Sequence, residues 1–87
     1  MDFGQALTEL KAGKKLKREN WKNLSFVYFV PGSTFSANKP PLNHLFPEGT
    51  QLEFRSHIDG CGADGVLGVW VPSMVDILAG DWVEVIE

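Results

Sequence analysis

A single cysteine, Cys61, is the feature that most limits what this 87-residue chain can fold into, because one thiol cannot form an intrachain disulfide. Chains this short bury roughly 60–65% of their unfolded surface and often need a disulfide, a metal or a partner subunit for stability. Hydrophobic residues make up 44% of the sequence, which argues against disorder and predicts a packed core. We therefore expect one domain over residues 1–87, with association between copies as the supplement.

The lone thiol also indicates a reducing compartment, because small secreted domains are rich in disulfides. The first residues lack the charged and then apolar layout of a secretion signal. The longest apolar run, residues 26–31, is too short to span a bilayer. The sequence therefore predicts a cytoplasmic location and no membrane partner.

The net charge of −3 is unevenly distributed along the chain. It argues against a nucleic acid polymer as partner, since such binding draws its affinity from neutralising many phosphates. All charged residues in the last quarter of the chain are acidic. Two interpretations of the basic N-terminal part stay open: a solvated face, or a rim that attracts an anion to a pocket. Six of the eight basic residues lie there: Lys11, Lys14, Lys15, Lys17, Arg18 and Lys22.

The first thirty residues contain signals for one helix and two strands. Asp2 followed by Gln5 is a capping-box pattern, and Gly13 is a typical helix stop, so a helix is expected between them. Residues 14–18 alternate enough for a short strand with Leu16 pointing inward. Ser25–Val30 is β-branched and aromatic, which predicts a strand buried on both faces.

The middle of the chain combines a proline-rich segment with a strongly alternating one. Residues 33–50 hold prolines at 40, 41 and 47, and we expect an ordered functional loop rather than regular structure. Residues 51–59 alternate with period two, which predicts one half-buried strand. Its inner row would be Leu52, Phe54, Ser56 and Ile58, and its outer row Glu53, Arg55, His57 and Asp59.

The last thirty residues predict a turn, a short helix and a strand. Four glycines between residues 59 and 68 indicate a turn that lets the backbone approach closely. Ser73 and Asp76 have capping-box spacing, and Gly80 ends the helix that they begin. Residues 81–87 alternate again. The expected class is α+β: a small domain rich in antiparallel sheet, with one N-terminal helix and one short C-terminal helix.

The sequence offers little for covalent chemistry. His57, Asp59, Cys61 and Asp64 lie within eight residues, but their spacing is not that of a zinc site, and a lone cysteine is usually inert. We expect no catalytic residue, no metal and no cofactor.

Binding is the better-supported class of function, although each feature also has a purely structural explanation. The glycine turn is either a hairpin turn or a phosphate cradle. Ser73 and Asp76 cap a helix, and a helix start also attracts anions. Arg55 and His57 either bind phosphate or stay solvated. Tryptophans are usually core residues, yet partly open indoles stack well on purines. Of Trp21, Trp70 and Trp82, the first is expected to be the most exposed.

The chain resembles the phage Thoeris anti-defence type two family, small proteins that inhibit a bacterial defence system by sequestering its signal. The resemblance covers nearly the whole sequence. Its motifs are residues 2–7, 10–15, Arg18, 20–21, 30–33, 47–50, 57–59, 63–65, Trp70, Ser73, Asp76, 78–79 and 81–82.

This resemblance implies a β-rich fold with one main helix and a homotetramer, a dimer of dimers with ligand pockets between subunits. The implied ligand is glycocyclic ADP-ribose, a cyclic ADP-ribose isomer made by a Toll/interleukin-receptor-domain enzyme, and cyclic dinucleotides for some members. By position, Trp21 and Trp70 would stack on the ligand, Asp64 and Ser73 would bond ribose or phosphate, and Asp76 would support the helix start.

The resulting hypothesis is a sponge that holds the signal without cleaving it, inside the infected bacterial cell. Three rivals remain at the level of the sequence: an inhibitor that docks on a host protein through its aromatic surface, an enzyme that cleaves the signal, and a structural phage component.

Overall fold

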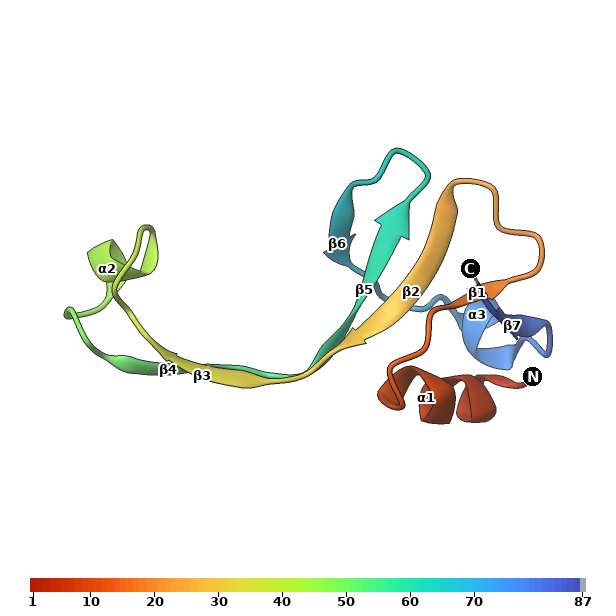
Figure 1. Cartoon of the computed structure of the whole chain (residues 1–87), viewed down its shortest axis with the longest axis horizontal. Coiled ribbons are helices and arrows are strands. Elements are labelled where there is room, and N and C mark those ends of the chain that lie inside the picture. The colour runs from red at the N-terminus through yellow and green to blue at the C-terminus, as the bar shows by residue number, and fades with distance from the viewer. Residues whose placement is uncertain (87) are drawn as a thin grey trace.

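The computed structural model of the chain describes residues 1–86 and confirms the α+β class (Figure 1). Five strands form one antiparallel sheet in the order β6-β5-β2-β1-β7, and β3 pairs with β4 in a second sheet of two strands. The elements in chain order are α1 (Phe3–Lys11), β1 (Leu16–Arg18), β2 (Leu24–Val30), β3 (Ser33–Ser36), α2 (Leu42–Leu45), β4 (Gln51–Phe54), β5 (His57–Gly62), β6 (Leu67–Val69), α3 (Met74–Leu78) and β7 (Trp82–Glu84).

Helix α1 begins and ends where its sequence predicts. The Asp2 carboxylate accepts a hydrogen bond from the Gln5 amide at 2.7 Å, and the Gln5 side chain accepts one from the Asp2 amide at 2.9 Å. These bonds satisfy two amides that a helix start leaves without partners. Gly13 follows the helix with φ of 94°, a left-handed conformation that costs glycine little.

The core lies between α1 and one face of the larger sheet. The buried residues of this cluster come from α1, β1, β2 and β7, so segments distant in sequence pack together. Leu16 is the inward residue of its strand, as predicted. No helix among the described residues is both long and apolar enough to cross a membrane. The buried cluster is Ala6, Leu10, Leu16, Val27 and Trp82.

Residues 31–56 project from the rest of the structure as a long two-stranded arm (Figure 1). We call this segment the arm, and residues 1–30 with 57–86 the body. The arm continues β2 and β5 outward, because Val30 pairs with His57 at its base and Ser33 with Phe54 just beyond. A Cβ on Gly32 would lie 2.9 Å from the carbonyl oxygen of Phe54, so the two antiparallel segments at the arm base approach each other at a distance that only glycine allows.

The prediction of an irregular loop over residues 33–50 is wrong in two places. Residues 33–36 form β3 and residues 42–45 form α2. Strand β3 exists because β4, which lies later in the chain, pairs with it from Ser33↔Phe54 to Ser36↔Gln51. A prediction from turn-forming residues uses only local sequence, so it cannot detect a pairing strand that begins fifteen residues later in the chain.

The single strand predicted over residues 51–59 is two strands that pair with different neighbours. Strand β4 pairs with β3, and β5 pairs with β2 and β6. The expected buried row also fails, because the Phe54 side chain is 58% exposed and Ser56 is exposed. The break follows from the position of the segment, since β4 leaves the body and loses the core that would cover its apolar face.

Two smaller predictions also need correction. Strand β2 is not buried on both faces, because only Val27 is fully buried and Ser25 is exposed. The glycine-rich turn is shorter than expected, since Gly60 and Gly62 belong to β5. Gly60 is buried because Leu24 and Trp70 pack where its side chain would be. That glycine serves packing in the sheet rather than a turn.

Candidate functional site

A cavity of about 420 Å³ opens beside the core where the body's loops meet α3. Its lining comes from the end of β1, the loop before β2 and the first residue of β2, the residue after β6, and α3. Three of the predicted ligand-binding residues (Trp21, Trp70 and Asp76) lie here together. The full lining is Arg18, Asn20, Trp21, Lys22, Asn23, Leu24, Trp70 and Asp76.

The three tryptophans form one edge-to-face cluster at this cavity. The ring of Trp82 lies 5.3 Å from that of Trp21 and 5.8 Å from that of Trp70, and the rings of Trp21 and Trp70 are 5.9 Å apart. Trp82 is fully buried, and its indole N–H donates to the Asp76 carbonyl at 2.9 Å. Trp21 and Trp70 are partly exposed, so the buried ring supports two rings that can contact a ligand.

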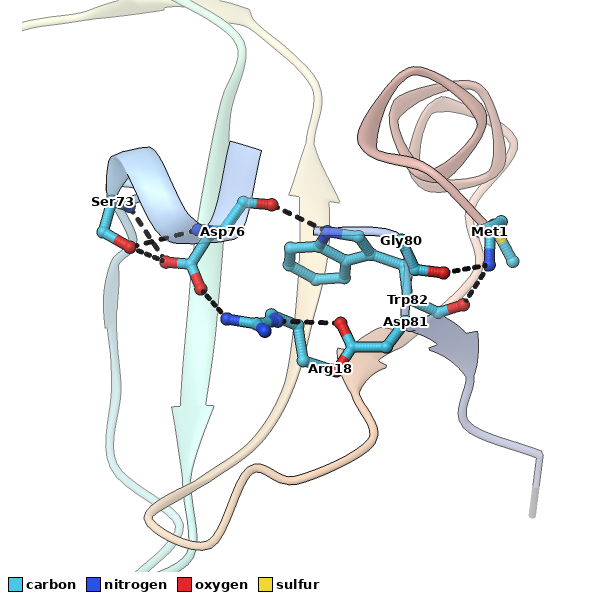
Figure 2. A network of polar contacts seen from close by, with 7 residues as sticks. All are labelled: Met1, Arg18, Ser73, Asp76, Gly80, Asp81 and Trp82. Carbon is cyan, nitrogen blue, oxygen red and sulfur yellow. Dashed lines mark hydrogen bonds and ion pairs between the residues drawn. The ribbon is translucent and has the colours of Figure 1, made fainter. Parts of the chain in front are cut away.

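Arg18, which lines the cavity, joins two carboxylates from different parts of the chain (Figure 2). Its Nε donates to Asp81 at 2.9 Å and its Nη1 to Asp76 at 3.1 Å. The side chains of Arg18 and Asp76 are only 16% and 15% exposed. Hydrogen bonds from Arg18 to Asp81 and then Asp76 raise the pKa of the guanidinium. The cation therefore fixes α3 and the start of β7 onto β1.

Asp76 is the most connected acid of the site, and the capping box predicted with Ser73 is confirmed (Figure 2). Its carboxylate accepts from the Ser73 amide at 2.9 Å and the Ser73 hydroxyl at 2.8 Å, and the Asp76 amide donates to that hydroxyl at 3.2 Å. Burial would raise the pKa of Asp76, but the hydrogen bonds from Ser73 and Arg18 outweigh it and lower that pKa. The carboxylate is thus held charged and in place.

The other predicted site residues lie elsewhere. Asp64 is in the turn between β5 and β6, where its carboxylate accepts from the Val66 amide at 3.0 Å. The neighbouring Ala63 amide donates to the Asn23 carbonyl at 3.0 Å, so this turn is tied to the loop that lines the cavity. Ser73 does not line the cavity and uses its hydroxyl for capping.

Arg55 and His57 lie at the base of the arm, apart from the tryptophans. Arg55 is exposed and outside any strand, so the predicted polar row on one strand is wrong for it. His57 Nε2 lies 3.2 Å from the Asp59 carboxylate, and its Nδ1 lies 3.0 Å from the Arg55 carbonyl oxygen. Within residues 1–86, no three His, Cys, Asp or Glu side chains converge in a metal-binding arrangement.

A larger cavity, of about 610 Å³, lies beside Arg55 at the arm base. It is lined mainly by small and polar residues of the arm, with Phe54 as its one aromatic. We favour the smaller cavity as the candidate site because it combines two indoles with a partly buried, hydrogen-bonded ion network. Those features give both a stacking surface and a rigid polar frame.

Five lining residues were not among those predicted to bind the ligand: Arg18, Asn20, Lys22, Asn23 and Leu24. The available signals were the basic run that ends at Lys22 and the asparagines on both sides of Trp21. These signals indicate a basic rim around a pocket. They did not show that Arg18 turns inward, because its two acidic partners lie 58 and 63 residues further along the chain.

Comparison with known proteins places this domain in a class of phage anti-defence proteins. A family profile described as "Tad2-like: Thoeris anti-defense 2-like domain" matches residues 1–85, and the chain belongs to this family. It is 33% identical over 85 residues to "Thoeris anti-defense 2" of Bacillus phage SP01, with 94% of this chain and 91% of that protein covered. The resemblance noted in the sequence is therefore confirmed at the level of the family.

Proposed function

We propose that the protein is a sponge that binds a cyclic nucleotide immune signal, withholds it from the Thoeris effector and does not cleave it. Its ligand is glycocyclic ADP-ribose, with cyclic dinucleotides as a second ligand class, and its place of action is the cytoplasm of the infected bacterium. Membership in the Thoeris anti-defence 2-like family supports the target system. The observation that carries the proposal is the pair of partly exposed indoles, Trp21 and Trp70, at one cavity.

The indoles and the ion network have different roles in this proposal. Stacking on an aromatic side chain contributes about 1–3 kcal/mol per base, so Trp21 and Trp70 supply much of the affinity for an adenine ring. Lys22 and the asparagines at 20 and 23 line the same cavity and offer donors to ribose and phosphate. The Arg18 network positions α3. Ser73 and Asp64 lie outside the cavity lining and would contact the parts of the ligand that extend beyond it.

Sequestration requires tight binding, which connects the function to assembly. A nanomolar dissociation constant corresponds to about −12 kcal/mol, and sites of that quality bury roughly 70–90% of a small ligand. The cavity of one copy is open to solvent. A second copy that covers it would complete the burial, so we propose a homotetramer, a dimer of dimers, with pockets completed between subunits.

The test is to add glycocyclic ADP-ribose to the purified protein, remove the free ligand, and denature the protein by heat. A sponge returns the nucleotide unchanged by mass spectrometry in a fixed ratio to protein. Recovery of altered nucleotide would instead identify an enzyme. Absence of bound nucleotide would favour one of the two other rivals, an inhibitor that docks on a host protein or a structural phage component.

Calorimetric titration then tests the site itself. Trp21→Ala is expected to weaken binding about 5- to 150-fold, the equivalent of one stacking contact. Phe26→Ala is the matched control, because Phe26 is next to the buried Val27 and therefore points to the opposite face of the sheet. Equal losses in the two variants would argue against the tryptophan cavity as the site.

A further inference from the structure

The arm has no support from the rest of its own chain. Strands β3 and β4 pair with each other, and within residues 1–86 no helix or strand of the body packs extensively against either strand or against α2. An isolated two-stranded hairpin is marginally stable in water unless another surface covers it. The arm nevertheless exposes large apolar side chains: Leu45 is 70% exposed, Phe46 41% and Phe54 58%.

The accessible surface area indicates how much surface a partner could bury. The radius of gyration is 15.8 Å, whereas a compact domain of this length has about 12 Å. The chain exposes 6081 Å², roughly 1000 Å² more than a compact monomer of its mass. A standard protein interface buries about 800 Å² on each partner, so the excess equals the share of one such interface.

The edge strand β6 is a second uncovered surface. It pairs with β5 on one side, and its other edge has no strand beside it among the described residues. Soluble proteins usually protect such edges with charges, prolines or a covering segment. Here the edge is apolar instead, because Leu67 is 59% exposed, Val69 72% and the nearby Val71 79%.

We infer that the arm of one copy packs against strand β6 of a second copy, and that the second copy does the same in return. A two-fold interface brings two different surfaces of the same chain together twice, which matches one apolar arm and one apolar edge per copy. Figure 1 shows that the arm leaves the body at one end, so there is room beside it for the body of a partner. This inference rests on the association of copies in the proposed function, and it specifies that the arm and β6 form a contact between them.

Crosslinking between two single-cysteine variants tests the contact directly. Cys61→Ser removes the natural thiol, and Leu45→Cys or Val69→Cys is added to that background. After the two proteins are mixed and equilibrated, a short bismaleimide is expected to join Leu45→Cys of one chain to Val69→Cys of the other. Crosslinks that form only within Leu45→Cys samples would show arm-to-arm contact and overturn the inference, as would the absence of any mixed product.

Sedimentation equilibrium of the natural chain provides an independent measure. Leu45→Glu and Val69→Lys should each weaken self-association at least tenfold, whereas Ile86→Lys should not, although Ile86 is 82% exposed. Circular dichroism checks that each variant is folded. Unchanged association in both interface variants would overturn the inference. If the natural chain is a monomer that still binds glycocyclic ADP-ribose, the inferred contact is overturned and the proposed binding function stands. If the chain is an oligomer that binds no nucleotide, the proposed binding function is overturned and the inferred contact stands.

Discussion

The body and the arm are both built from antiparallel strands, yet different interactions stabilise them. In the body, α1 and Trp82 cover the sheet, and the Arg18 network fixes its last elements. In the arm, the main side-chain contact is one stacked pair, Phe35 with Phe54, at 4.9 Å between ring centroids. Strand pairing alone holds the arm together as an extended hairpin, whereas the body is stabilised because apolar side chains cover its sheet.

Truncation of the central tryptophan should have the largest effect and should separate the two regions most clearly. Trp82→Ala removes a fully buried ring that contacts two other indoles, and the expected loss is about 3–5 kcal/mol. Such a loss is close to the whole stability of a small domain, so the variant should be mostly unfolded at 37 °C. Urea unfolding followed by far-ultraviolet circular dichroism measures it. Phe46→Ala in the arm is the counterpart and should cost under about 0.5 kcal/mol in a single, unassociated copy.

Loss of the arginine clamp should be the next largest effect. Arg18→Gln leaves Asp76 and Asp81 without their cation, and the expected cost is about 2 kcal/mol because these side chains are only partly buried. Arg18→Lys should restore part of this, since one ammonium cannot match the fork that bonds two carboxylates. The neighbouring Lys17→Gln is the control and should change the unfolding free energy by less than about 0.5 kcal/mol. Equal effects at both positions would contradict the assigned role.

Removal of the arm should change stability less than either substitution. Val30 and His57 are directly paired, so residues 31–56 can be replaced by Asn-Gly, a favoured two-residue hairpin turn. Compared with a single, unassociated copy of the natural chain, we expect the shortened chain to fold with a loss below about 1 kcal/mol, because the buried cluster lies entirely in the body. Thermal unfolding monitored by circular dichroism tests this. An unfolded product would show that the arm stabilises the body after all.

Acid should destabilise the body through Asp76, and this is the smallest effect that we expect to resolve. The folded-state pKa of Asp76 lies below the ordinary value of 3.8, so its stabilisation is complete above that pH and is lost as the pH falls through the folded value. In Asp76→Asn the unfolding free energy should therefore vary less between about pH 4 and pH 2. Identical pH profiles for the two proteins would show that the carboxylate contributes nothing.

The candidate site was only partly accessible from the sequence. The sequence predicts Trp21, Trp70 and Asp76 as ligand residues, and the structure brings them together at one cavity. Arg18 is not among them, because its importance depends on Asp76 and Asp81, which reach it from elements far along the chain. Arg55 and His57 were grouped with the site by their alternation with apolar residues, although they lie at the base of the arm. Alternation assigns a residue to a face of a strand, and it does not identify the neighbour beyond that face.

Local chemistry determined what the sequence revealed by itself. Both capping boxes, the stop at Gly13, the inward position of Leu16 and the α+β class follow from interactions within a few residues or from simple periodicity. The tertiary structure alone decided that residues 51–59 divide between two sheets, that residues 33–36 become a strand, and that three tryptophans share one cluster. The physical reason is that pairing and packing depend on partners distant in the chain, and the free energy of those contacts outweighs local preference.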